Sequence, residues 1–322
     1  MRSEGLFMVE CGRVEVRPVD VPDPGPGSVQ VELRACGLCR ADIDYFTGTL
    51  PLKMPALVGH EGAGVVTKVG PQVEGIAPGD KVTMAAGGLF ARLANCAVSR
   101  ITRLPAHVER FEHWLAEPVA CVVNALRLCP VSPGDRVVLV GTGFMGLLIL
   151  QGLRHEPTRE LIAIDARPER LELARQIGAD YALDPQAEED KETVERLTRT
   201  GADLVFECAG TQEGFQLAYE AVRRAGTLCL FSWHKGERRV DLGRWHAYGL
   251  RVLNVSPTMA PDFLQLLAPS VACLWRGIFN LEPLVTHTAP LEDARQLFET
   301  AARPHRAGGH PPAGFIKGAV LF

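Results

Sequence analysis

The chain has 322 residues, a formal net charge of −4 and 47% hydrophobic residues, a composition typical of a globular protein with room for two domains. This charge argues against nucleic acid or an anionic membrane surface as a partner. The sequence has no apolar run near the roughly 18 to 20 residues of a membrane span, and we expect no secretion signal. The nine scattered cysteines favour reduced thiols and a cytoplasmic location over a disulfide framework.

Residues 1–122 are predicted to form a β-rich domain. Short runs such as 28–37 and 59–70 alternate apolar and polar residues, and turns rich in Gly and Pro separate them. The stretch 282–322 has a strand–helix–strand pattern and is too short to form a domain alone. We therefore expect it to complete the first domain.

Residues 123–281 are predicted to form a second domain built on a doubly wound parallel sheet. Between about residues 134 and 256, six nearly continuous apolar strands alternate with helices, as in parallel sheets that are covered on both faces. Six such strands suit the dinucleotide-binding fold. The predicted fold class is therefore α/β.

The segment VVLVGTGFMG places Gly141, Gly143 and Gly146 directly after a strand and at the start of a helix. Missing side chains at such positions allow a tight turn and the close approach of a pyrophosphate. The N–H groups of the first helical turn, which includes Phe144 and Met145, favour phosphate oxygens. Without further support, the motif would also fit a glycine-rich turn that binds nothing.

Asp165 supplies that support, because it closes the next strand 19 positions after Gly146. An acid there can accept hydrogen bonds from the ribose hydroxyls of NAD, and it repels the 2′-phosphate of NADP. We therefore predict NAD, with NADP less favoured. Arg167 and Arg170 lie just beyond and would be either phosphate contacts or solvent-facing charges; we include Arg170 among the candidate cofactor contacts.

Cys36 and Cys39 form a C-x-x-C, a pattern shared by zinc clusters, redox pairs and unrelated thiols. The sequence has no second C-x-x-C, which argues against a four-cysteine cluster, and the strand-rich setting argues against a thioredoxin-like pair. His60 follows 21 positions after Cys39, and Glu61 is next to it. A lone cysteine or histidine is more often a core or surface residue than a ligand, so spacing alone leaves the choice open.

Seven segments, in this order, resemble the zinc-dependent medium-chain dehydrogenases, and most closely the polyol branch with sorbitol and threonine dehydrogenases. They are CGLCRADIDYFTG, PALVGHEGAGVVTKVG, GDKV, AEPVACVVNALR, VVLVGTGFMG, ECAG and PLEDARQLFETA. The similarity extends from about residue 8 to the C-terminus. It implies a GroES-like catalytic domain followed by a Rossmann domain.

The resemblance also implies a catalytic zinc. Its ligands would be Cys39, His60 and Glu117, with Glu61 as an exchanging ligand or a close neighbour and a water in the open position. Asp42 matches an acid that orients the histidine, although it would also suit a simple turn cap.

This chain departs from the family pattern at two places. Relatives with a structural zinc carry a four-cysteine lobe between the segments VTMAAGG and LFARLANCAVSR, whereas this chain has Cys96 alone there; we expect at most one zinc per chain. Ala41 replaces the Ser or Thr that normally passes the alcohol proton outward, and Asp44 stands where many relatives have a relay histidine. We expect a carboxylate, Glu61 ahead of Asp44, to carry the proton.

The implied reaction is the reversible, NAD-dependent oxidation of a secondary alcohol (polyol, amino alcohol or sugar-like) to its ketone. Arg40 and Lys317 match positions that contact the pyrophosphate, although both also fit plain surface cations. The substrate and physiological direction stay open, and we expect a homodimer or homotetramer. The alternatives are a zinc-free NADPH-dependent quinone or enone reductase of the same fold and a non-catalytic NAD-binding redox sensor.

Overall fold

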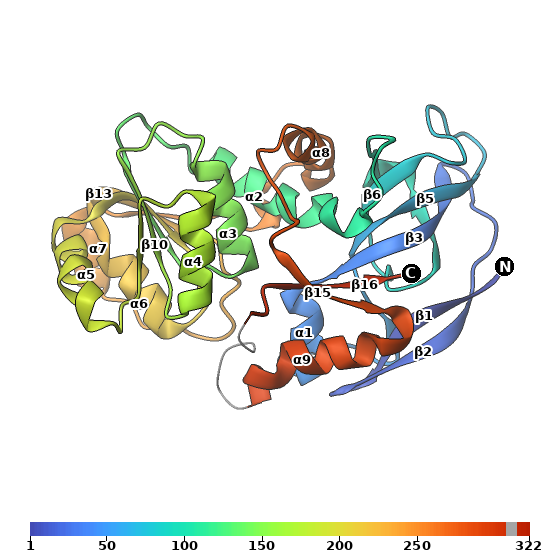
Figure 1. Ribbon diagram of the computed structural model, residues 1–322, viewed down its shortest axis with the longest axis horizontal. Coiled ribbons are helices and arrows are strands. Elements are labelled where there is room, and N and C mark those ends of the chain that lie inside the picture. Colours follow the sequence, from blue (N-terminus) through green and yellow to red (C-terminus); the bar gives the residue numbers. More distant parts are fainter. Residues whose placement is uncertain (307–313) are drawn as a thin grey trace. The chain divides into compact units, whose positions relative to one another are not determined.

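The computed structural model describes residues 1–306 and 314–322, and the chain divides into two compact units. Unit 1 comprises Met1–Ala120 and Leu264–Phe322, and unit 2 comprises Cys121–Phe263. Figure 1 shows the strand-rich first unit and the alternating strands and helices of the second. None of the described helices has the length and apolar character needed to cross a membrane.

The boundary at the end of unit 2 differs from the sequence prediction. Residues 264–281 were expected in the nucleotide-binding domain, but the structure groups them with unit 1. The physical reason is that helix α8 (Leu267–Trp275) packs on strand β8 (Ile101–Arg103). In addition, the Trp275 ring lies 4.7 Å from the ring of His107, measured between ring centroids.

Unit 1 is built on two sheets. The larger has the strand order β15-β16-β3-β5-β6-β8, with β7 also paired to β3, and the smaller has the order β2-β1-β4. The strands are β1 (Arg2–Glu10), β2 (Arg13–Asp20), β3 (Ser28–Leu38), β4 (Ala56–Leu57), β5 (Glu61–Val69), β6 (Lys81–Ala85), β7 (Leu93–Ala97), β8, β15 (Val285–Pro290) and β16 (Lys317–Leu321). Its helices are α1 (Arg40–Thr47), α8, α9 (Ala294–Arg306) and the start of α2 (Ala116–Leu128).

Two strand pairings in unit 1 position the candidate site. Strand β3 pairs with β5 so that Gly37 lies opposite Glu61, and β16 pairs with the other edge of β3 so that Gly318 lies opposite Leu38. The C-terminal strand is thereby placed beside the residue that precedes Cys39. Helix α9 packs on α1, with the Phe298 ring against those of Phe46 and Phe90.

Unit 2 is a six-stranded parallel sheet with the order β11-β10-β9-β12-β13-β14. The strands are β9 (Arg136–Val140), β10 (Glu160–Ile164), β11 (Tyr181–Leu183), β12 (Ala202–Glu207), β13 (Val222–Leu230) and β14 (Arg251–Asn254). The helices are α3 (Phe144–Leu153), α4 (Pro168–Ile177), α5 (Glu188–Thr200), α6 (Gln212–Glu220) and α7 (Leu242–Tyr248). The sheet confirms the predicted doubly wound fold, whose order reverses between β9 and β12.

Short 3-10 helices occur in both units: Val98–Arg100, Phe111–His113, Pro257–Met259, Phe263–Leu266 and Leu291–Asp293. The glycine-rich loop that follows β9 and the loop that follows β12 lie at the point where the strand order reverses. This carboxyl edge is where doubly wound sheets bind ligands.

Candidate active site

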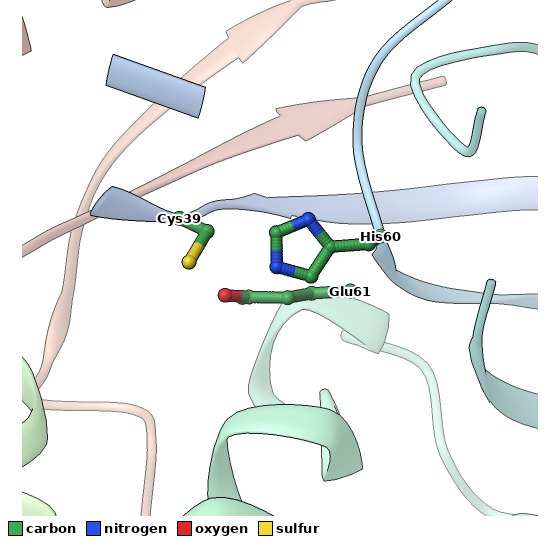
Figure 2. Close-up of side chains that lie close together, drawn as sticks. All are labelled: Cys39, His60 and Glu61. Carbon is green, nitrogen blue, oxygen red and sulfur yellow. The ribbon is translucent and has the colours of Figure 1, made fainter. Parts of the chain in front are cut away.

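Cys39, His60 and Glu61 bring their potential metal-ligating atoms within 4.8 Å of one another. Cys39 is the N-cap of α1, directly after β3, and Glu61 begins β5 next to it in the sheet. Figure 2 shows the sulfur, the imidazole ring and the carboxylate gathered around one small space. A thiolate, an imidazole and a carboxylate are the donor types that zinc takes in proteins.

Asp42 lies beside both Cys39 and His60. Its Oδ2 accepts a hydrogen bond from the backbone N–H of Cys39 at 3.0 Å, and its Oδ1 lies 3.9 Å from Nδ1 of His60. The first contact caps the helix, and the second holds a negative charge against the outer nitrogen of the ring. The structure shows the capping contact directly, and the orienting role of Asp42 stays a prediction.

The surroundings of His60 favour positive charge at this place. Burial lowers the pKa of the His60 imidazole, but its hydrogen bond to Cys39 and the charges of Cys39, Asp42 and Glu61 outweigh burial and raise that pKa to about 11. Burial also raises the pKa of the Cys39 thiol and of the Asp42 carboxyl, and a cation bound between these groups would favour their charged forms.

Lys317 is buried beside Glu61. Its Nζ donates a hydrogen bond to Glu61 Oε1 at 2.9 Å and lies 2.6 Å from Oε2, and the two side chains are 5% and 2% exposed. Burial lowers the pKa of the Lys317 ammonium, but the charges of Glu61, Cys39 and Glu117 give a net increase. The surface-cation alternative for Lys317 is therefore wrong, since its ammonium contacts the carboxylate of the candidate metal site.

Gly37 provides the space for the Glu61 carboxylate. A Cβ added at Gly37 would lie 2.1 Å from Glu61 Oε2 and 2.9 Å from Leu115 Cδ1, distances that atoms cannot adopt without rearrangement. The sequence analysis did not single out this glycine. The available signal was a glycine inside a strand, which often marks a close approach of another group.

Glu117 and Asp44 are not among the three residues of the cluster, although the charge of Glu117 acts on the neighbouring Lys317. Glu117 lies in the first turn of α2, and within the described residues the cluster contains Glu61 instead. Asp44 is buried on α1, where its Oδ1 accepts a hydrogen bond from Nε of Arg40 at 3.0 Å. The Arg40 side chain is itself 60% exposed.

Two of the three loop glycines in unit 2 are required by the fold itself. Gly141 has φ +96°, and a Cβ on it would lie 2.6 Å from the backbone N of Ala209. A Cβ on Gly146 would lie 2.0 Å from the carbonyl oxygen of Gly141. In contrast, a Cβ on Gly143 would meet Nη1 of Arg170 at 3.8 Å, an ordinary contact. The space above Gly143 therefore suits the approach of a ligand.

Asp165 joins the glycine-rich loop to the turn after β10. Its Oδ2 accepts hydrogen bonds from the backbone N–H of Thr142 at 2.7 Å and from the Thr142 hydroxyl at 3.1 Å. Its Oδ1 accepts one from the backbone N–H of Arg167 at 3.1 Å, and Arg170 Nη1 lies 3.7 Å from Oδ2. Thr142 was not singled out from the sequence, although its place between two loop glycines was a signal. Phe144 and Met145 begin α3 beside this loop.

Comparison with known families matches both halves of the chain. Residues 25–106 match the family described as alcohol dehydrogenase GroES-like domain, and residues 145–268 match the family described as zinc-binding dehydrogenase. Sorbitol dehydrogenase of Rattus norvegicus is 27% identical over 340 aligned residues, covering 94% of each chain.

Two solved structures share the whole fold. A protein of Sinorhizobium meliloti 1021 described as a zinc-binding dehydrogenase, bound to NADP, superposes with a TM-score of 0.87 at 23% identity, covering 100% of both chains. Galactitol-1-phosphate dehydrogenase of Escherichia coli superposes with a TM-score of 0.85 at 21% identity, covering 99% of this chain and 100% of that one.

The contact between Gly37 and Glu61 gives a direct prediction for metal binding. Gly37→Ala is expected to displace the Glu61 carboxylate and to weaken zinc binding by about tenfold or more, because one charged ligand is lost from position. Competition with a chromophoric chelator measures the affinity. Gly87→Ala is the matched control, because a Cβ there meets no atom within 4 Å in the described structure. Equal zinc affinity in both variants would contradict the prediction.

The glycine-rich loop gives a second prediction, in which two similar changes have different effects. Gly143→Ala is expected to preserve the thermal unfolding midpoint and to weaken nicotinamide cofactor binding, because its Cβ projects toward the ligand space. Gly146→Ala is expected to lower the midpoint, since its Cβ overlaps the backbone of the loop. Calorimetry and a fluorescence titration with NADH separate the two effects. A Gly143→Ala protein with unchanged NADH affinity would refute the assignment of this loop.

Proposed function

Because the chain belongs to the medium-chain alcohol dehydrogenase superfamily, we propose that it interconverts a secondary alcohol and its ketone with NAD as the hydride carrier. The observation that carries the proposal is the convergence of Cys39, His60 and Glu61 in unit 1, together with the dinucleotide-binding sheet of unit 2. The sorbitol dehydrogenase relative supports a polyol or a similar alcohol as substrate.

The residues present fit one catalytic zinc. The Glu61 carboxylate is buried beside Cys39 and His60, and Lys317 Nζ lies 2.6 Å from its Oε2, so a metal ion there would share this carboxylate with the ammonium. We assign Cys39, His60 and Glu61 as the protein ligands. The resemblance implied Glu117 as the third ligand; we propose instead that Glu117 is a nearby anionic group. Zinc, when bound, lowers the pKa of an alcohol hydroxyl, and NAD accepts the hydride.

The remaining residues at this site bind, orient and move protons. Asp42 holds the Nδ1 edge of His60, which leaves the other ring nitrogen for the metal. Ala41 has no hydroxyl to relay a proton. We propose Glu61 as the first proton carrier, because its carboxylate is the one beside Cys39 and His60. Asp44 is the second candidate, since it already accepts a hydrogen bond from Arg40.

The cofactor assignment rests on Asp165. Its carboxylate lies beside the glycine-rich loop and would repel a 2′-phosphate. Arg170 Nε and Arg167 Nη1 are buried without a hydrogen-bond partner among the described residues, so they offer donors to a phosphate group. The S. meliloti structure holds NADP, and we propose that Asp165 turns the preference of this chain toward NAD.

A combined metal and activity assay tests the proposed function. The purified protein is analysed for zinc and incubated with NAD and a panel of polyols, amino alcohols and sugar alcohols. We expect one zinc per chain and NADH formation with at least one secondary alcohol. Turnover of quinones with NADPH in zinc-free protein would favour the reductase alternative. Binding of both zinc and NAD without turnover of any alcohol or ketone would favour the redox sensor.

The Asp165 assignment predicts a change in cofactor preference. Asp165→Ser is expected to raise the Kd for NADH by about tenfold, a loss of about 1.4 kcal/mol, because hydrogen bonds to the ribose are lost. The same change should lower the Kd for NADPH, because an anionic neighbour of the 2′-phosphate is removed. Fluorescence titration measures both constants. If the unmodified protein binds NADPH more tightly than NADH, Arg167 and Arg170 form a phosphate clamp and the assignment is wrong.

The proton-carrier assignment predicts unequal effects of two carboxylate changes. Glu61→Gln is expected to lower turnover by about 10² to 10⁴ and to flatten its pH dependence, while Asp44→Asn has the smaller effect. Steady-state kinetics across pH measures both, and each variant is assayed with its zinc content determined. NADH affinity of Glu61→Gln should stay unchanged. Full turnover and an unaltered pH profile in both variants would refute a carboxylate route.

A further inference from the structure

We propose that Lys317 competes with the metal ion for Glu61 and thereby weakens zinc binding. The inference rests on the metal site of the proposed function. Its basis is that one buried ammonium contacts both oxygens of a carboxylate assigned as a ligand, at 2.9 and 2.6 Å. A carboxylate with a cation on both oxygens has less negative charge to offer to a second cation.

The position of the Glu61 carboxylate does not depend on Lys317 alone. The backbone of Glu61 is paired on both sides, with Gly37 of β3 and with Ala85 of β6. Its side chain occupies the space left by the missing Cβ of Gly37. The carboxylate therefore stays directed toward Cys39 and His60 when the ammonium is removed. Charge, rather than placement, is the main contribution of Lys317.

The charges around the ammonium explain why the chain keeps a cation there. Cys39 and Asp42 approach from the turn at the start of α1, Glu61 from β5, and Glu117 from α2 acts on Lys317 as well. The buried carboxylates of Asp42 and Glu61 are costly without a counter-charge. Lys317 supplies that charge before the metal binds. Once zinc is present, the same ammonium is a positive neighbour of a divalent ion and repels it.

The test compares zinc affinity in charge-removing and charge-keeping variants of the full-length protein. Lys317→Met and the more polar Lys317→Gln are expected to lower the zinc Kd by about tenfold, measured by competition with a chromophoric chelator. Lys317→Arg keeps the charge and should stay within about threefold of the unmodified protein. Without metal, the variants that bind zinc more tightly should be the less stable ones. The thermal unfolding midpoints of metal-free Lys317→Met and Lys317→Gln should therefore be lower than those of the unmodified protein and Lys317→Arg.

A double-mutant cycle identifies Glu61 as the group through which Lys317 acts. Glu61→Gln should weaken zinc binding, and adding Lys317→Met to that variant should change the zinc Kd much less than it does alone. The Co²⁺ forms give an independent spectroscopic readout, because their visible d–d absorption depends on ligand number and geometry. Because Lys317 acts through charge rather than placement, the Co²⁺ spectra of Lys317→Met and Lys317→Arg should both match that of the unmodified protein, and a changed spectrum in Lys317→Met alone would contradict the inference.

The possible results show whether the proposed function fails or only this inference does. If the unmodified protein binds no zinc, the proposed function fails together with the inference. If it binds zinc and Lys317→Met has an unchanged or higher Kd, the inference alone is overturned, because Lys317 then has a structural or an orienting role. If Lys317→Met does not fold without metal, the zinc Kd of Lys317→Gln provides the same test.

Discussion

The buried contact between Glu61 and Lys317 is the constraint on which the first unit depends. The two residues are 256 positions apart in the chain, and they meet because β16 and β5 both pair with β3. Removing one partner of a buried ion pair leaves an unpaired charge, at a cost of about 3 to 5 kcal/mol. The C-terminal segment is therefore part of the candidate site, and unit 1 has to be assembled from both ends of the chain.

In unit 2, the hydrogen-bonded carboxylate of Asp165 has a comparable role, because it holds two loops together. Asp165 binds the backbone and hydroxyl of Thr142 and the backbone of Arg167, so it joins the loop after β9 to the turn after β10. These contacts lie at the carboxyl ends of neighbouring parallel strands, where the sheet leaves room for a ligand. The acid proposed to select the cofactor thus also holds the glycine-rich loop after β9.

The sequence predicted those features that are encoded locally. Six apolar strands, the glycine spacing and Asp165 each need a short window, and the structure confirms the sheet that they imply. The partner of Lys317 could not be predicted, because it depends on the register of strands that are distant in the sequence. The choice between Glu61 and Glu117 depends likewise on side-chain placement. Helix α8 was expected in the other domain, and its packing on β8 is a contact between distant segments that no short window encodes.

The turn after Cys39 shows how the proton route can vary while the metal site is kept. Asp42 caps α1 through the backbone of Cys39, and this contact needs no hydroxyl at residue 41. Asp44 and Arg40 pair along the same helix, and the exposed Arg40 side chain connects this buried carboxylate with the surface. Glu61 therefore belongs to both the proposed ligand set and the proposed proton route, whereas Asp44 belongs to the proton route alone. A change at Asp44 can alter the rate and its pH dependence without displacing Cys39 or His60, so the proposed proton route can vary while these two residues keep their places.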